Sequence, residues 1–518
     1  MKNSKIKIKG FSKNRDQIEK NNNKKSKLTE VSINKAFEFI KKGEVKKAEI
    51  IYRKLITSGV KDCRIYTNLA SICAARNEIL EMISLLKIAI DLDPDYPLAY
   101  FNLGIALKKK GDLNSSIKAF QKAIDLNPNF SEAFNSLGNV FKEKDDLDSA
   151  IYQYQKALKL NPRYVDAYYN LGNILIIKGH LNSAITLLKE SIKLQPNHID
   201  SHWDLALAQL LSGNYKDGLI NYEWRWKINK GNKFHADPKI KLYKGKITEI
   251  KDSLLVVSEQ GLGDSMQYMR YIPYLKSQGI NISFCVQEKL HNLIKVSGIH
   301  SNPLKFDEVK SVEKGHWLPL LSLPKLLQIN PENPLVSNPY IFTTDELIIK
   351  WKNILASEKK PIVGINWQGN PNVERDILNG RSLPLETFSL IACNHDIRLL
   401  SLQKGFGSEQ LDTCSFKDNF VKSQNEINKI WDFLEMAAII ANCDLVITSD
   451  TAVAHLAGGM GKKTWLLLQC VPEWRWGMKG DKTFWYSSTR LFRQKERYNW
   501  HQVIERVDKE LHNEFVTI

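Results

Sequence analysis

Residues 95–128 read DYPLAYFNLGIALKKKGDLNSSIKAFQKAIDLNP, and the pattern of this stretch recurs along the first half of the chain. Prolines return every 34 residues at 94, 128, 162 and 196, and glycines return with the same period at 104, 138 and 172. Such a period indicates an array in which each repeat is one supersecondary unit stacked on its neighbours. The sequence therefore predicts an α-solenoid over residues 31–230, with about six helix pairs.

Each recurring position has a physical task. The small residue at the Gly104 position lets the first helix of a pair pack closely against the second. The Gly111 position falls between the two helices, where Gly, Asn and Asp tolerate a left-handed backbone. The prolines end one repeat because they lack the N–H that would continue a helix. The period and these residues are the tetratricopeptide signature, and such a superhelix usually binds a protein or peptide in its groove.

A polar position also recurs within the repeats, at Asn68, Asn102 and Asn170, with Ser136 and Asp204 at the equivalent places. Two interpretations remain open. These side chains either form a ladder that binds the backbone of a peptide, or they are solvated and capping residues in an Asn-rich chain.

The formal net charge is +17, and a basic chain invites comparison with nucleic-acid-binding proteins. Residues 1–30 carry ten basic against three acidic residues, whereas residues 231–518 carry 36 against 32. Because much of the excess lies on a short segment, the charge argues against a nucleic-acid-binding domain. Residues 1–30 are predicted to be a disordered basic tail, either solvated without a role or in contact with acidic partners.

Composition also bears on the compartment. No window reaches about 18 consecutive apolar residues, so we expect no transmembrane segment. The tail lacks the apolar block and cleavage site of a signal peptide. The seven cysteines are odd in number and form no Cys-x-x-Cys pair, which favours buried thiols over disulfides or a zinc site. These features predict a cytoplasmic protein without a bound metal.

The pattern changes after residue 230. Residues 231–250 are predicted to be a polar connector, and residues 251–350 a Rossmann-like lobe. In that lobe a strand over residues 254–258 is followed by Glu259-Gln-Gly-Leu-Gly-Asp264 and an amphipathic helix. The loop is no dinucleotide fingerprint, because Met266 stands where the third glycine belongs. Asp264 is either a simple helix cap or a general base at a strand end.

Residues 351–518 are predicted to form a second Rossmann-like lobe, with strands over 362–367, 397–402, 443–448 and 463–468 and a terminal helix. The stretch from Ser449 to Gly461 opens a helix at the end of a strand, and the N–H groups there suit a diphosphate. Asp450 and Thr451 stand at its start, and Ala452 is small enough for close approach. His455 follows one turn later. The alternative is an Asp cap and a core histidine.

Two cations lie at further loops of this lobe. Arg381 stands in a glycine turn and Lys404 follows a strand, so both are available for phosphate. Gln368 lies in the turn after residues 362–367. Two α/β lobes with loop-rich strand edges suggest a ligand cleft between them.

Five segments carry a family resemblance: residues 259–264, 366–370, 381–385, 401–405 and 449–461. Together they resemble bacterial glycosyltransferases fused to tetratricopeptide repeats. Their catalytic half is similar to the heptosyltransferase family (glycosyltransferase family 9), which has the GT-B fold. The layout is also similar to that of the O-linked N-acetylglucosamine transferases. The resemblance covers residues from about 250 to 518.

The resemblance implies an inverting, metal-independent transfer from a nucleotide-diphospho sugar, with no other cofactor. It makes Asp264 the base for the acceptor hydroxyl, and Gly261 and Gly263 the glycine loop beside it. Donor-binding residues would be Asp450, Thr451, Ala452, His455 and Gln368, with Lys404 or Arg381 neutralising the leaving diphosphate. A protein or glycan would be the acceptor, with a protein partner in the repeat groove. The competing hypothesis is a protein-interaction scaffold whose α/β half binds a nucleotide sugar without catalysis.

Overall fold

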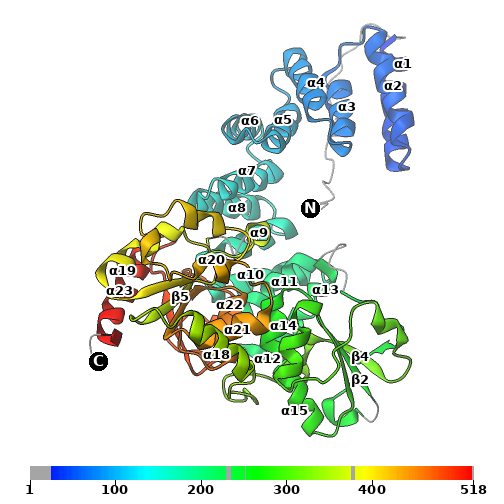
Figure 1. Ribbon diagram of the computed structural model, residues 1–518. Helices are drawn as coiled ribbons and strands as arrows, with labels where there is room; N and C mark the ends of the chain where they lie inside the picture. Colours follow the sequence, from blue (N-terminus) through cyan, green and yellow to red (C-terminus); the bar gives the residue numbers. More distant parts are fainter. Residues whose placement is uncertain (1–24, 229–234, 251–252, 375–379, 516–518) are drawn as a thin grey trace. The chain divides into compact units, whose positions relative to one another are not determined.

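The computed structural model describes residues 25–228, 235–250, 253–374 and 380–515 (Figure 1). Residues 1–24, and with them most of the expected basic tail, lie outside the described residues. Helix α1 begins at Lys25, inside the range that the sequence assigns to that tail. The chain divides into two compact units, one of Met1–Ile174 with Thr186–His198 and one of Leu175–Ile185 with Ile199–Ile518.

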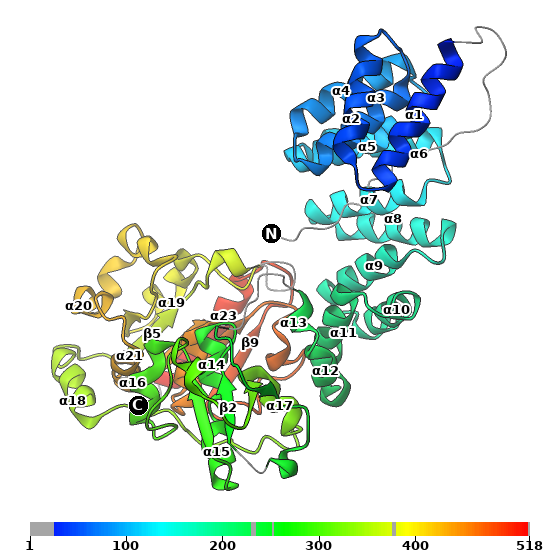
Figure 2. The same cartoon turned by 90° about the vertical axis from the view of Figure 1, so that its right-hand side faces the viewer.

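The N-terminal part is a stack of antiparallel helix pairs, coloured blue to green in Figures 1 and 2. The pairs match the six 34-residue repeats, so the predicted helical-repeat solenoid is confirmed. Their bounds are α1 Lys25–Lys41, α2 Val45–Thr57, α3 Cys63–Ala75, α4 Ile79–Leu92, α5 Pro97–Lys110, α6 Leu113–Leu126, α7 Ser131–Glu143, α8 Leu147–Leu160, α9 Val165–Ile177, α10 Leu181–Leu194, α11 Ile199–Leu211 and α12 Tyr215–Tyr222.

Two recurring positions have the predicted physical roles. A Cβ added at Gly104 would lie 2.7 Å from the Phe120 ring, and one at Gly138 would lie 2.6 Å from the Tyr154 ring. Only glycine permits these helix pairs to approach so closely. Gly111 has φ 87° at the end of α5, the left-handed conformation expected between the helices.

Two of the recurring asparagines are buried, and the third, Asn170, is half-buried. Asn68 and Asn102 are each only 4% exposed. Asn68 donates to the Tyr52 hydroxyl at 3.2 Å, Asn102 donates to Ser71 Oγ at 3.4 Å, and Asn170 donates to Asn135 Oδ1 at 3.0 Å. These amides join neighbouring helices within the array, because buried amides need partners.

The α/β part contains two parallel sheets, and both lie in the second compact unit. The first sheet has the order β1-β4-β2-β3. Its strands are β1 Lys241–Leu242, β2 Leu254–Val257, β3 Ile282–Cys285 and β4 His316–Pro319. Its helices are α14 Leu262–Tyr268, α15 Tyr271–Ser277, α16 His291–Val296 and α17 Leu323–Leu326, and a short helix α13, Arg225–Ile228, precedes β1.

The second sheet has the order β6-β5-β7-β8-β9. Its strands are β5 Ile362–Asn366, β6 Arg398–Ser401, β7 Leu445–Ser449, β8 Thr464–Leu468 and β9 Thr489–Arg493. Its helices are α18 Asp345–Ile354, α19 Ser389–Asn394, α20 Gln424–Asn428, α21 Phe433–Ala441, α22 Ala452–Gly459 and α23 His501–Phe515. The four apolar residues expected on one face of the last helix, Val503, Ile504, Val507 and Leu511, are all buried.

Three features differ from the expectation. The single helix expected after the glycine loop is split into α14 and α15, because Pro273 has no N–H to donate to the Met269 carbonyl. The polar connector supplies the edge strand β1, which pairs with β4. Strand β9 has no counterpart among the expected strands; it pairs with β8 at the edge of the second sheet. Within the described residues, no helix is both long and apolar enough to cross a membrane.

Candidate functional site

The glycine loop lies at the carboxyl end of β2, between β4 and β3 in the first sheet. Successive connections run to opposite sides of β2, and such a switch point is where open parallel sheets bind ligands. Gly261 is the N-cap of α14, and its N–H donates to Asp264 Oδ2 at 2.9 Å. Asp264 therefore has the capping role considered as one alternative, through this one carboxylate oxygen.

A guanidinium group occupies the other oxygen of Asp264. Arg475, in the 3-10 helix η10 (Trp474–Trp476) after β8, forms an ion pair with Asp264 Oδ1. Arg475 Nη1 lies 3.0 Å from Glu473 Oε1, and Arg475 Nε donates to the Tyr268 hydroxyl at 3.0 Å. The Arg475 side chain is 8% exposed, so carboxylates rather than water balance its charge.

The second switch point lies between β5 and β7, and α22 begins there. Thr451 is the N-cap of α22, but its side chain makes no capping hydrogen bond to the helix. The Thr451 hydroxyl instead donates to Asn366 Oδ1 at 2.8 Å, at the end of β5. Because that hydroxyl is turned away, the first N–H groups of α22 are available to an anion.

His455 lies inside α22 and is 5% exposed. Its Nδ1 lies 2.9 Å from the Tyr486 hydroxyl, and its ring stacks on the Trp476 ring at 5.6 Å between centroids. Burial, with Arg475 and Arg270 adding to the effect, places the pKa of His455 well below its usual value. The imidazole is therefore neutral, and its environment includes the partners expected of a core histidine.

The two switch points meet at Gly263. A Cβ added there would lie 2.8 Å from His455 Cδ2 and 3.4 Å from Ala452 Cα. Gly263 is thus the loop glycine whose missing side chain is required, because α14 packs directly against α22. This contact places Asp264 of one sheet and the start of α22 from the other in a single cluster.

Asp450 completes an excess of acids in this cluster. It is 9% exposed, and burial raises its pKa although Arg381 and Arg475 oppose the shift. Burial likewise raises the pKa of Glu473 to about 7, opposed by Arg475 and reinforced by Asp450. Glu473 therefore releases its proton close to neutral pH, at a higher pH than a free glutamate does.

The two remaining cations differ in their surroundings. Arg381 pairs with Glu374 Oε1 at 3.2 Å and lies over Gly369, within electrostatic reach of Asp450. Lys404 donates to the Ile427 carbonyl at 2.5 Å, and burial lowers its pKa to about 8. Among the described residues no carboxylate pairs with Lys404, so its charge is available to an anion.

Gln368 lies at the end of β5, where its Oε1 accepts from Gln410 at 3.0 Å. Its carbonyl accepts from Gln403 at 2.8 Å, next to Lys404 in the chain. Contacts of the described residues thus link Gln368 to the Lys404 loop, and none joins either residue directly to Asp264. The structure brings Gly263, Ala452 and His455 together by direct contact, with Asp264 next to Gly263 in the chain, and places Lys404 and Gln368 at neighbouring strand ends.

Sequence reasoning missed the residues that hold the glycine loop. The tetrapeptide Glu-Trp-Arg-Trp occurs twice, at residues 223–226 and 473–476. Both arginines are buried, and both pair with an acid of the loop: Arg225 with Glu259 and Arg475 with Asp264. The repetition of this unusual tetrapeptide was the signal that could have found them.

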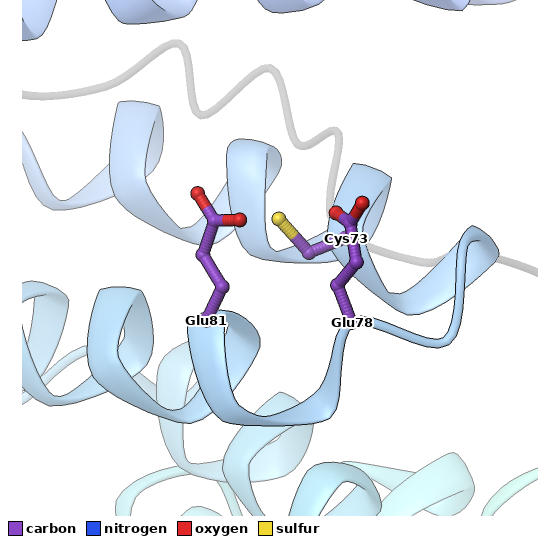
Figure 3. Close-up of side chains that lie close together, drawn as sticks. All are labelled: Cys73, Glu78 and Glu81. Atoms are coloured by element: carbon purple, nitrogen blue, oxygen red, sulfur yellow. The ribbon is translucent and has the colours of Figure 1, made fainter.

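A second group of potential ligands lies in the helical repeats, where Cys73 faces Glu78 and Glu81 (Figure 3). Burial, then Glu81 and Glu78, raises the pKa of Cys73 to about 12, which disfavours the thiolate that metals bind. Glu81 also accepts from Arg53 at 2.8 Å. This cluster therefore has the character of an ion-paired helix surface. Cys73, Cys285 and Cys443 are buried, whereas Cys393 is exposed.

Family models match the helical repeats. A model described as TPR repeat matches residues 70–111 and 138–176, and models described as tetratricopeptide repeat match residues 97–130, 119–152 and 165–198. The array therefore consists of tetratricopeptide repeats, which indicate a role in protein interaction.

Solved structures resemble the chain over about a third of its length. MamA from Desulfovibrio magneticus is 23% identical, with 32% of this chain and 92% of that chain covered and a TM-score of 0.28. YrrB, described as a TPR protein with an unusual peptide-binding site, is 22% identical, with 35% and 93% covered and a TM-score of 0.30. A thermophilic TPR protein of Thermus thermophilus is 18% identical, with 35% and 99% covered and a TM-score of 0.31. No curated protein sequence matches the chain.

Proposed function

We propose that this protein is a glycosyltransferase of GT-B fold that moves a sugar from a nucleotide-diphospho donor to a protein or glycan acceptor, with inversion and without a metal. The observation that carries the proposal is the contact of Gly263 with Ala452 and His455. It joins the switch points of two parallel sheets, so an acid from one faces a helix N-terminus from the other. The acceptor hydroxyl needs the acid as its base, and the diphosphate needs the N–H groups of the helix N-terminus.

Asp264 acts as the base. The acceptor hydroxyl attacks the anomeric carbon, its proton passes to the Asp264 carboxylate, and the bond from that carbon to the diphosphate breaks. The ion pair with Arg475 fixes the carboxylate in place. The N–H groups at the start of α22 receive the negative charge of the leaving diphosphate, assisted by Arg381 and Lys404.

The raised pKa values of Glu473 and Asp450 support the same function. Three ionised carboxylates beside Arg475 would repel a diphosphate. Because burial raises the pKa of Glu473 to about 7 and also raises that of Asp450, part of that negative charge is removed near neutral pH. The helical repeats, as protein-binding units, would hold a protein partner or acceptor.

A non-catalytic scaffold that binds a nucleotide sugar is the second candidate. One observation favours it: both oxygens of Asp264 are already engaged, by Gly261 N–H and by Arg475. A catalytic Asp264 must exchange one of these partners for the acceptor hydroxyl.

A donor screen separates the two. Purified full-length protein is mixed with a panel of nucleotide-diphospho sugars, and both the thermal shift and the release of nucleoside diphosphate are measured with protein and glycan acceptors. The transferase predicts release that depends on acceptor. A thermal shift without release favours the scaffold, and neither signal with any donor contradicts both.

Asp264→Asn tests the base. We expect turnover to fall by about 10²–10⁴-fold while the donor-induced thermal shift persists, because the amide cannot take the proton. Asp307→Asn, at an exposed aspartate before the 3-10 helix η3 (Glu308–Ser311), is the matched control and should behave as the wild type. Wild-type turnover in Asp264→Asn would refute the assignment.

A further inference from the structure

The glycine loop, residues 259–264, carries an acid at each end, and each acid is paired with the arginine of one Glu-Trp-Arg-Trp segment. Asp264 at its end meets Arg475, whereas Glu259 at its start meets Arg225. Arg225 lies in α13, directly after the last helical repeat and within the same compact unit as both sheets. Ion pairs therefore fix the loop at both ends, and the arginine of one pair, Arg225, follows the last helical repeat.

The Arg225 contact is a fork-shaped pair. Arg225 Nε lies 3.1 Å from Glu259 Oε2, and Nη2 lies 2.7 Å from Oε1. The remaining donors reach the Tyr222 carbonyl at 3.2 Å, Glu223 Oε1 at 2.7 Å and Ser322 Oγ at 2.8 Å. All three guanidinium nitrogens have partners, and Arg225 is 2% exposed. Such bidentate pairs fix geometry as well as charge, which a lysine could not do.

Glu259, the partner of Arg225, directly precedes Gln260, a residue with a strained backbone. Gln260 has φ 62°, in the left-handed region that is unfavourable for a residue with a side chain. The residue before the 3-10 helix η2 (Glu288–Leu290) supports this conformation, since Gln287 Nε2 donates to the Gln260 carbonyl at 3.3 Å. Glu259 also accepts from Leu321 N–H at 3.3 Å, so its carboxylate ties the loop to the end of β4. Strained residues persist only where their surroundings hold them.

We propose that Arg225 is a positioning residue of the α/β site. By gripping Glu259 it keeps Gln260 in the left-handed conformation, and it thereby sets where Asp264 stands opposite α22. The significance of Asp264 rests on the proposed function, whereas the hold on the loop does not. The last repeat then contributes a working part of the site in addition to any partner that the array binds.

Hydrogen exchange on the full-length wild type is the first test. The Gly261 amide, which donates to Asp264, should exchange more slowly than an exposed turn amide, because the loop is fixed at both ends. Exchange as fast as that of an exposed turn, such as residues 313–315, would overturn the proposal without any variant. This readout needs no substrate, so it stands even if the donor screen finds no activity.

Variants provide the second test. Arg225→Met leaves Glu259 buried and unpaired, whereas Arg225→Met with Glu259→Gln removes both charges together. We expect the double variant to melt near the wild-type temperature, yet to show loop exchange about tenfold faster and kcat reduced about tenfold with the donor KM little changed. Recovery of both loop protection and kcat in the double variant would reduce the pair to a charge buried for stability, and overturn the proposal.

Two further variants sharpen the result. Arg225→Lys keeps the charge without the fork, and should show the same faster loop exchange in a folded protein. Arg64→Met removes a comparable arginine from the repeats, where Arg64 pairs with Asp62 and Glu30, and should leave loop exchange and kcat unchanged. Normal loop exchange in Arg225→Lys would also count against positioning.

Discussion

The two Glu-Trp-Arg-Trp segments share four residues and differ in everything around them. The first enters the helix α13 after a helical repeat, and the second enters the 3-10 helix η10 after strand β8. In both, the arginine pairs with the glutamate two residues before it and with one acid of the glycine loop. Identical local sequence thus gives the same ion-pair unit, and the fold decides what that unit holds.

The difference lies in how many acids each arginine serves. Arg225 has two, Glu223 and Glu259, and hydroxyl and carbonyl partners complete its shell. Arg475 has Glu473 and Asp264 as direct partners and Asp450 within electrostatic reach. Burial raises the pKa of a carboxyl in both groups, Glu259 in the first centre (Arg225, Glu223 and Glu259) and Glu473 in the second (Arg475, Glu473 and Asp264). The second centre alone has a third acid, Asp450, in reach, so the first suits positioning and the second suits chemistry.

The largest expected effect is that of Arg475→Met. It leaves the half-buried carboxylates of Asp264 and Glu473 without their shared cation, so we expect a loss of about 3 kcal/mol in the free energy of unfolding. Urea unfolding of the full chain measures it. Arg490→Met is the control, because Arg490 is 41% exposed and its pair with Glu510 should contribute less than about 1 kcal/mol. Equal losses in the two variants would show that Arg475 and its acids contribute no more to stability than an exposed ion pair does.

Gly263→Ala should come next. Its new methyl group would meet His455 Cδ2 at 2.8 Å and push α14 from α22, at a cost of roughly 1–3 kcal/mol. Thermal unfolding measures the change. Gly261→Ala is the matched control two residues earlier, where the added atom meets only the Asp264 carboxylate at 3.2 Å. If Gly261→Ala lowers the unfolding temperature more than Gly263→Ala does, the packing of α14 on α22 is not what requires a glycine at residue 263.

Glu473→Gln tests whether folding raises the pKa of Glu473. Its folded pKa of about 7 lies above the unfolded value, so the folded state binds the extra proton and the wild type loses stability as pH rises from about 4.5 to about 7. The variant should lack this decline, which is on the order of 1–3 kcal/mol. Unfolding at a series of pH values reports it, with the exposed Glu409→Gln expected to keep the wild-type slope. An unchanged slope in Glu473→Gln would contradict the raised pKa.

Ser322→Ala should have the smallest effect. Its hydroxyl bonds both Arg225 at 2.8 Å and Glu223 at 3.0 Å, yet both keep other partners, so the loss should be about 1 kcal/mol. Denaturant unfolding compared with Ser311→Ala, an exposed hydroxyl on a backbone carbonyl, isolates this contribution. A loss in the free energy of unfolding above that of Gly263→Ala would mean that Arg225 and Glu223 depend on the Ser322 hydroxyl more than their other contacts indicate.

Much of the fold was predictable because its signals are local. The 34-residue period located the helix pairs, and five strands were each anticipated within a few residues: β2, β5, β6, β7 and β8. Most of what failed depended on distant partners, although the break at Pro273 is a local signal. Strands β1 and β9 are short or lie at sheet edges, and Pro273 broke a helix whose apolar pattern looked continuous. The asparagines of the repeats also needed a neighbouring helix to explain them.

The sequence by itself determined the repeat array, the order of the α/β elements and the residues at the two switch points, since period, apolar runs and glycines act over short distances. Only the tertiary structure decided that Gly263 packs on Ala452, and that the two Glu-Trp-Arg-Trp arginines reach the two ends of one loop. The physical reason is burial. A guanidinium removed from water must find carboxylates wherever the fold provides them, and the linear sequence does not indicate which ones.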